Sequence, residues 1–106
     1  MVKKKFLKTK CQVEFDLPEG LAQDVERVCL VGEFNQWDTQ ATPLKRGRDK
    51  RFKVSLDLPL NQEYQYRYLI NDTNWQNDWD ADSYVPNPFS DTNSVVNTFE
   101  AEKVTA

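Results

Sequence analysis

Tryptophans in polar surroundings are the first residues whose type and context indicate chemistry. Trp37 lies within the turn-like segment 35–38, and Trp75 lies within the equally polar segment 74–77, whereas a core tryptophan normally has apolar neighbours. A flat indole ring can stack on the apolar C–H face of a pyranose, whose hydroxyls then need donors and acceptors around the ring. The two tryptophans therefore indicate either a carbohydrate-binding surface or plugs that close the ends of a folded core.

Polar side chains that suit the rim of such a surface occur in the same regions of the sequence. They are Asn35, Arg67, Asn74 and Asn93. In the segment 64–70 the three tyrosines and the isoleucine share one parity and Arg67 takes the other. If the tyrosines point inward, Arg67 points to solvent on the outer face, where its guanidinium can donate to several hydroxyls.

These residues must be positioned by strands, because the chain has short alternating segments and no helical period. Alternation is clear over 6–15, 52–58 and 64–70, an apolar strand is expected over 28–34, and a closing strand over 94–100. The stretch 45–53 reads as a basic hairpin loop around Gly47, and 78–92 reads as a long loop. About seven strands with turn residues between them predict an all-β, immunoglobulin-like β-sandwich. The 106 residues are predicted to form one domain, 1–106.

Composition and charge limit the classes of partner and the cellular location that we expect. The net charge of −3 argues against a nucleic-acid partner, since that affinity rests on basic residues. No apolar run is long enough for a membrane helix, and the basic start has no apolar segment behind it, so we expect no secretory signal and a cytoplasmic location. Cys11 and Cys29 are expected to be buried free thiols, although a disulfide between neighbouring strands is geometrically possible.

The sequence gives little support for catalysis. There is no histidine, so we expect no catalytic residues of the His-dependent kind, no metal site and no cofactor. Asp78, Asp80 and Asp82 superficially resemble a calcium loop, but Ser83 and Phe89 stand where such a loop needs glycine and glutamate. A glycosidase needs two carboxyl groups set across a cleft with several sugar subsites, for which a sandwich of this size has little room.

Three segments, in this order and with fitting gaps, carry a family resemblance. They are VCLVGEFNQWD (28–38), EYQYRYLINDTNWQND (63–78) and VPNPFSDTNSVV (85–96). Together they resemble the family-48 carbohydrate-binding module over about residues 10–100. This group includes the N-terminal early-set domains of isoamylases and glycogen branching enzymes, and the glycogen-binding domain of the AMP-activated protein kinase β subunit.

The resemblance implies an early-set β-sandwich that binds an α-1,4-linked glucan such as glycogen or starch without catalysing a reaction. Hydrolase activity in this group would come from the catalytic domains of relatives. The resemblance further implies five sugar-contacting residues, each matched through its local motif: Trp37, Arg67, Trp75, Phe89 and Asn93. The sequence departs from the family pattern where Arg67 replaces a frequent lysine, Ser90 a frequent glycine and Trp79 a common proline.

A docking or structural domain of the same fold is the alternative, with a protein partner in place of a glucan. The two hypotheses differ in what they expect of the tryptophans. A glucan-binding module should expose Trp37 and Trp75 on one surface beside Arg67. A docking domain should bury them or show a large apolar patch elsewhere.

Overall fold

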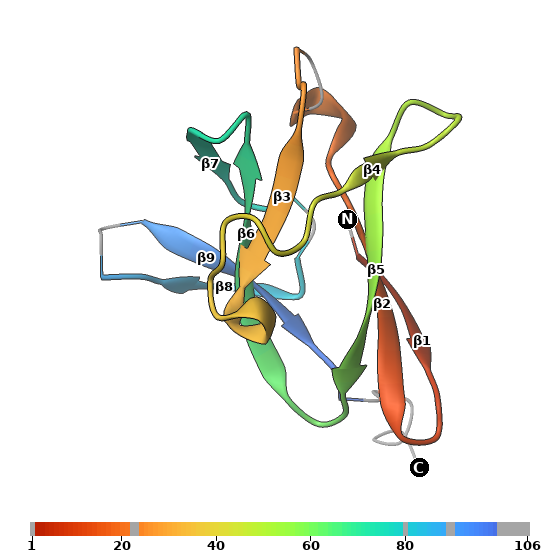
Figure 1. The fold of residues 1–106 in the computed structure, drawn as a ribbon. Coiled ribbons are helices and arrows are strands. Elements are labelled where there is room, and N and C mark those ends of the chain that lie inside the picture. Colours follow the sequence, from red (N-terminus) through yellow and green to blue (C-terminus); the bar gives the residue numbers. More distant parts are fainter. Residues whose placement is uncertain (1, 22–23, 80, 89–90, 100–106) are drawn as a thin grey trace.

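Alternating apolar side chains build two antiparallel sheets that pack face to face (Figure 1). The computed structural model describes residues 2–21, 24–79, 81–88 and 91–99. The first sheet lies at the right of Figure 1 and has the strand order β1-β2-β5-β4. Its strands are β1 (Val2–Phe6), β2 (Lys10–Asp16), β4 (Lys45–Arg46) and β5 (Phe52–Pro59).

The second sheet carries the strand around which the functional site is built. It has the order β3-β6-β9-β8, and β7 also pairs with β6. Its strands are β3 (Val28–Gly32), β6 (Glu63–Ile70), β7 (Asn74–Gln76), β8 (Ser83–Pro86) and β9 (Thr92–Asn97). Strand β3 lies along one side of β6, while β9 and β7 pair with its first and second halves. Strand β6 is therefore the centre of this sheet, and both of its edges are paired with neighbouring strands.

The core between the sheets follows the parity expected from the sequence. Tyr64, Tyr66, Tyr68 and Ile70 of β6 are buried in the main hydrophobic cluster, together with side chains of the first sheet such as Phe15. The prediction of an all-β sandwich is confirmed, with nine strands among the described residues. Because the inward residues of β6 fill the core, its outward residues are left to form the floor of a surface.

Several segments differ from the sequence-based prediction. The strand expected over 28–34 ends at Gly32, and β7 has no counterpart among the expected strands. Residues 6–15 form no single strand, because Leu7 N donates to Lys10 O (2.8 Å) and closes a hairpin between β1 and β2. The alternation runs through that turn without interruption, which is why it does not reveal the break. The predicted long loop 78–92 contains β8, which pairs with β9. Strands β1 and β8 lie at sheet edges, where only one neighbour supports each of them.

A buried polar cluster joins β6 to the segment that follows β7. The hydroxyls of Tyr66 and Tyr68 both donate to Asp78 Oδ2, at 2.9 and 3.1 Å, and Asp78 is buried. Burial raises the pKa of both tyrosines, and the negative charge of Asp78 raises it further. The two hydroxyls therefore stay protonated and remain donors to the carboxylate.

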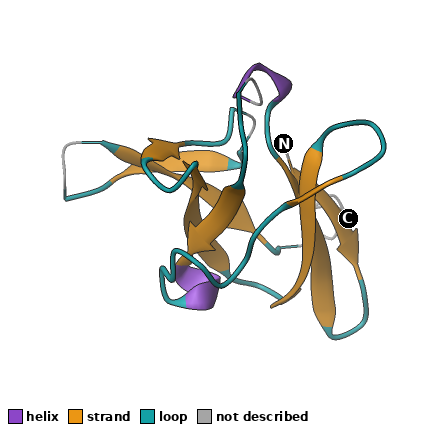
Figure 2. Cartoon of the chain, turned by 45° about the horizontal axis from the view of Figure 1, so that its top comes forward, coloured by secondary structure: helices purple, strands orange, loops and turns teal. Residues whose placement is uncertain are grey.

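Two short 3₁₀-helices lie at opposite ends of the sandwich (Figure 2): η1 (Glu19–Leu21) and η2 (Glu33–Asn35). No helix in the described ranges is long and apolar enough to cross a membrane. Cys11 lies in the main core and Cys29 in a separate cluster on the second sheet, and both are buried free thiols as predicted.

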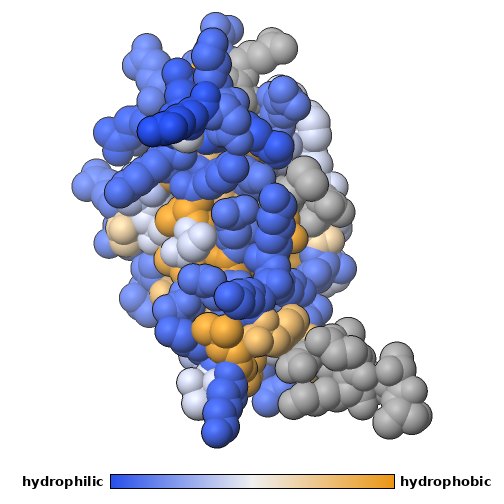
Figure 3. All heavy atoms as spheres, turned by 90° about the vertical axis from the view of Figure 1, so that its right-hand side faces the viewer, coloured by the Kyte–Doolittle hydropathy of each residue, from blue (hydrophilic) through white to orange (hydrophobic). Residues whose placement is uncertain are grey.

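The strands of the first sheet contain no tryptophan that its outer face could display. Viewed from that side, hydrophilic side chains cover most of the molecule around a limited hydrophobic area (Figure 3). The ion pair Lys10–Asp57 (2.9 Å) joins β2 to β5 in this sheet. The basic stretch 45–53 forms the expected hairpin between β4 and β5, where Gly47 N donates to Arg51 O (2.9 Å).

Candidate functional site: a tryptophan groove on the second sheet

The outer face of β6 forms the floor of a groove of about 660 Å³. Four of the residues predicted from the sequence line it: Trp37, Arg67, Trp75 and Asn93. They come from the turn after η2, from β6, from β7 and from β9. We call this surface the tryptophan groove. Strand pairing brings these four residues together although they span more than half of the sequence.

Trp37 is displayed by a turn that is anchored on both sides. Phe34 in η2 packs into the core against Phe15, with ring centroids 5.6 Å apart, so the helix cannot lift off the sandwich. Gln36 and Trp37 then adopt left-handed backbone angles, with φ of 56° and 57°. This region costs a residue with a side chain about 1–2 kcal/mol. Trp37 N donates to Gly32 O (2.9 Å), which fixes the turn and holds the indole 38% exposed.

Trp75 reaches the groove from the short strand β7. It pairs with Leu69 of β6, and opposite residues of an antiparallel pair point to the same face. That face is the outer one, where Leu69, Cys29 and Val31 form a small buried apolar cluster. Trp75 is 39% exposed, almost the same as Trp37. The two indoles therefore present comparable, half-open surfaces on the same side of the sandwich.

Arg67 lies between these elements and does not extend into open water. It pairs with Val31 across the strands, on the outer face as predicted, but its side chain is only 16% exposed. Its Nη2 lies 3.1 Å from Asp91 Oδ2. A hydrogen bond from the Thr92 amide and the positive charge of Arg67 lower the pKa of Asp91, so this carboxylate is ionised at neutral pH. The guanidinium is thus held along the groove by an ion pair.

A chain of hydrogen bonds crosses the floor of the groove. Gln65 N donates to Glu33 Oε1 (2.7 Å), and Asn93 Nδ2 donates to Gln65 Oε1 (3.0 Å). Asn87 Nδ2 in turn donates to Asn93 Oδ1 (3.1 Å). An amide group has two donors and two acceptor sites, so these bonds use half of the capacity of Asn93. The side chains are locked in place while some donors and acceptors stay available.

Sequence reasoning missed part of this lining: Glu33, Gln65, Asn87 and Pro88. Gln65 has the same parity as Arg67 in β6, so the alternation used to place Arg67 outward already contained the signal for it. Asn87 and Pro88 lie outside the strands, where no period indicates a direction, and Glu33 lies in η2 although a strand was expected there. Only the folded chain shows that they reach the groove.

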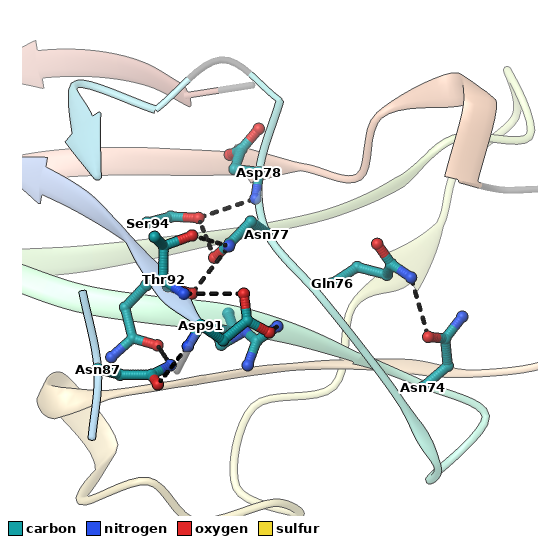
Figure 4. Close-up of polar contacts among 10 residues, drawn as sticks. Asn74, Gln76, Asn77, Asp78, Asn87, Asp91, Thr92 and Ser94 are labelled. Atoms are coloured by element: carbon teal, nitrogen blue, oxygen red, sulfur yellow. Dashed lines mark hydrogen bonds and ion pairs between the residues drawn. The ribbon is translucent and has the colours of Figure 1, made fainter. Parts of the chain in front are cut away.

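Two of the polar residues singled out from the sequence make hydrogen bonds elsewhere in the fold. Asn35 Oδ1 accepts from Gly32 N (3.0 Å), while its Nδ2 donates to Leu30 O (2.9 Å). Asn35 therefore stabilises the turn that carries Trp37. Asn74 is exposed and accepts a hydrogen bond from Gln76 within β7 (2.9 Å; Figure 4). Neither residue lines the groove. The predicted contact Phe89 lies outside the described residues.

Trp79 is separated from the other two tryptophans. Its ring covers Gly20 so closely that a Cβ on that glycine would lie 2.4 Å from Trp79 Cη2. The ring is 60% exposed, packs beside η1 and does not line the groove. The most exposed tryptophan is thus the one that lies away from the site, which local composition alone does not reveal.

Side-chain hydrogen bonds join the segment that follows β7 to strand β9 (Figure 4). Asn77 Nδ2 donates to Thr92 O (2.8 Å), and Ser94 Oγ donates to Asn77 Oδ1 (2.9 Å). Ser94 Oγ also accepts from Asp78 N (2.9 Å). These bonds connect the end of β7 to the start of β9, so the elements that carry Trp75 and Asn93 are held at a constant separation.

The acidic run after β7 is divided among different partners. Asp78 binds the two buried tyrosines, and Asp82 forms an ion pair with Lys4 of β1. Asp80 lies outside the described residues. Within the described part of the chain, no group of three or more histidine, cysteine, aspartate or glutamate residues could hold a metal ion.

Comparison with known protein families gives a match over most of the chain. A family model described as the glycogen recognition site of AMP-activated protein kinase matches residues 21–105, which is most of the chain and includes every residue of the groove. No curated protein matches the chain. The early-set resemblance and the β-sandwich agree with this match. The chain belongs to the family of glycogen recognition sites of AMP-activated protein kinase, a family of carbohydrate-binding domains.

Proposed function

We propose that this chain is a non-catalytic α-glucan-binding module that stacks glucose units on Trp37 and Trp75. The observation that carries the proposal is that both indoles are half exposed and line one groove. A glucan chain offers successive sugar rings with apolar faces, and two aromatic rings that line one groove can each receive such a face. Membership in a carbohydrate-binding family supports the same ligand class.

The polar residues of the groove supply the hydroxyl contacts in this proposal. Arg67 donates from the guanidinium N–H groups that its ion pair leaves available, and Asn93 donates and accepts through the remaining half of its amide. Both side chains are fixed by their neighbours before the sugar arrives, so little further ordering is needed on binding. Phe89 is a further proposed contact, on its motif match alone.

Binding at one such groove should be weak, because it has two stacking rings and few polar contacts. We expect dissociation constants in the micromolar to millimolar range, which correspond to about −8 to −4 kcal/mol. A glucan polymer presents many equivalent segments, so rebinding along the chain raises retention without further contacts. The proposed role is therefore to hold the chain, or a protein to which it is attached, on glycogen or a starch-like polymer.

Titration with maltoheptaose, read by isothermal calorimetry or backbone amide NMR shifts, tests the proposal. Trp37→Ala and Trp75→Ala should each weaken binding by about 30-fold, the loss of roughly 2 kcal/mol typical of a buried aromatic anchor. Trp79→Ala is the matched control and should change the affinity less than twofold, since this ring lies outside the groove. Unchanged spectra at millimolar sugar would reject glucan binding and favour a docking role.

A further inference from the structure

The charge of the tryptophan groove depends on Asp91, a residue that contacts the lining residue Arg67. The Arg67 side chain lines the groove, whereas Asp91 is not among its described lining residues and is more than half exposed. Asp91 Oδ2 nevertheless lies 3.1 Å from Arg67 Nη2. Asp91 therefore acts on the groove through Arg67 and is a positioning residue.

The backbone around Asp91 holds its carboxylate in this place. Asp91 N donates to Asn87 Oδ1 (3.2 Å), and Asn87 N donates back to Asp91 O (2.9 Å; Figure 4). Thr92 N donates to Asp91 Oδ1 (2.8 Å), which leaves Oδ2 directed at the guanidinium. With one carboxylate oxygen on the backbone and the other on Arg67, the carboxylate is held in place beside the guanidinium.

An arginine without a carboxylate partner would give this groove a different chemistry. A guanidinium binds carboxylates and phosphates through paired hydrogen bonds and its positive charge. Here one side of the guanidinium already has a carboxylate, and the charged lining residue Glu33 adds a second negative group. Arg67, Asp91 and Glu33 together carry one positive and two negative formal charges, so an incoming anion meets no net attraction.

We propose that Asp91 is a specificity-determining residue that neutralises Arg67, so that the groove accepts neutral glucans and discriminates against glucans bearing acidic groups. This inference rests on the proposed function, because it concerns the same groove. Arg67 then serves as a donor to sugar hydroxyls. Without Asp91, the same arginine becomes a binding group for anionic substituents.

The experiment compares two substituted sugar rings of similar bulk on the full chain. One is β-cyclodextrin carrying several carboxymethyl groups, and the other carries a similar number of neutral hydroxypropyl groups. Several substituents per ring ensure that any glucose unit seated in the groove has one nearby. Asp91→Asn keeps the shape and an acceptor for Thr92 N. Asp57→Asn is the matched control, because Asp57 pairs with Lys10 on the other sheet.

The wild-type chain should bind the carboxymethyl ring more weakly than the hydroxypropyl ring. Asp91→Asn should raise the affinity for the carboxymethyl ring relative to the neutral ring by about tenfold, or about 1.4 kcal/mol. Asp57→Asn should leave this ratio unchanged, although it changes the net charge equally. Adding Arg67→Gln to Asp91→Asn should abolish the gain, because the freed guanidinium is its source.

The ratio of the affinity for the carboxymethyl ring to that for the hydroxypropyl ring is compared between variants. If this ratio in Asp91→Asn lies within twofold of that in Asp57→Asn, the inference is overturned while glucan binding is left intact. A wild-type preference for the carboxymethyl ring would overturn it as well. If Asp91→Asn fails to fold, the test uses the wild-type chain alone. Its preference for the hydroxypropyl ring over the carboxymethyl ring should shrink as salt rises from about 20 mM to about 500 mM, and a constant ratio of the two affinities would contradict the inference. Failure of the wild-type chain to bind unmodified β-cyclodextrin would instead refute the proposed function.

Discussion

Gly32 connects the stability of the sandwich to the display of Trp37, and Gly32→Ala tests that connection. Its φ of −169° is an extended value that any residue adopts, so the backbone angle gives no need for glycine. The need comes from contact: an added Cβ would lie 2.5 Å from Gln65 O and 2.8 Å from Tyr66 Cβ. Both atoms belong to β6, so β3 and β6 would have to separate locally.

The size of the effect follows from what must move. Overpacking a well-filled region costs about 1–3 kcal/mol, and the upper part of that range applies because a backbone oxygen cannot rotate away. Alanine also reduces the entropy of the unfolded chain, which offsets about 0.5–1 kcal/mol. The expected net loss is about 2 kcal/mol, equivalent to a fall in Tm of about 9 °C for a chain of this size.

Thermal unfolding followed by circular dichroism measures this loss, and the other two glycines are its controls. The three atoms nearest to a Cβ on Gly20 all belong to the ring of Trp79, which is largely exposed and can swing aside. A Cβ on Gly47 would lie 3.1 Å from the exposed side chain of Asp49. Alanine at either position should change stability by no more than about 0.5 kcal/mol.

Gly32→Ala should also weaken binding of maltoheptaose, because Gly32 O accepts the hydrogen bond that fixes Trp37. Unfolding of Gly32→Ala at the wild-type temperature, or an equal loss of stability in Gly20→Ala, would refute the expected clash between β3 and β6. A loss of stability without any change in affinity would show that Trp37 is positioned independently of Gly32.

Two further predictions concern the buried polar cluster. Asp78→Ala removes the acceptor shared by Tyr66 and Tyr68 and should lower the free energy of unfolding by about 3 kcal/mol, measured by urea denaturation; a loss below about 1 kcal/mol would contradict this. The raised pKa of Tyr66 and Tyr68 predicts that stability holds up to the unfolded-state value of about 10 and declines as the pH rises further. Ultraviolet titration should show both tyrosines unionised until unfolding, and ionisation of all tyrosines in the folded chain would refute it.

The parts of the fold that were predictable are those in which local pattern and burial coincide. Strand β5 alternates along its whole length and β6 alternates as far as Tyr68, and one face of each packs into the core, so the sequence shows both the strand and its orientation. Strands β1 and β8 were missed for the opposite reason. Each lies at a sheet edge, and its pairing with a neighbour defines it more than its own pattern does.

In the candidate site, too, features that depend on local sequence were predictable, and contacts between distant segments were not. Trp37 and Trp75 were recognisable from their polar neighbours, and parity in β6 placed Arg67 on the outer face. The hydrogen bonds among Gln65, Asn87 and Asn93 were not recognisable, because three separate segments supply them. Parity predicts the face on which a side chain lies but says nothing about which distant side chain meets it there.

The sequence by itself determined the sheet-forming segments, the inward tyrosines and the residue types suited to sugar, because these depend on neighbours a few positions away. The tertiary structure decided which tryptophans share a groove, and it separated Trp79 from Trp37 and Trp75 although Trp79 is the most exposed. It also placed Asp91 against Arg67, an ion pair between residues 24 positions apart. Such contacts arise only when strand pairing closes long loops, so their geometry is a property of the folded chain.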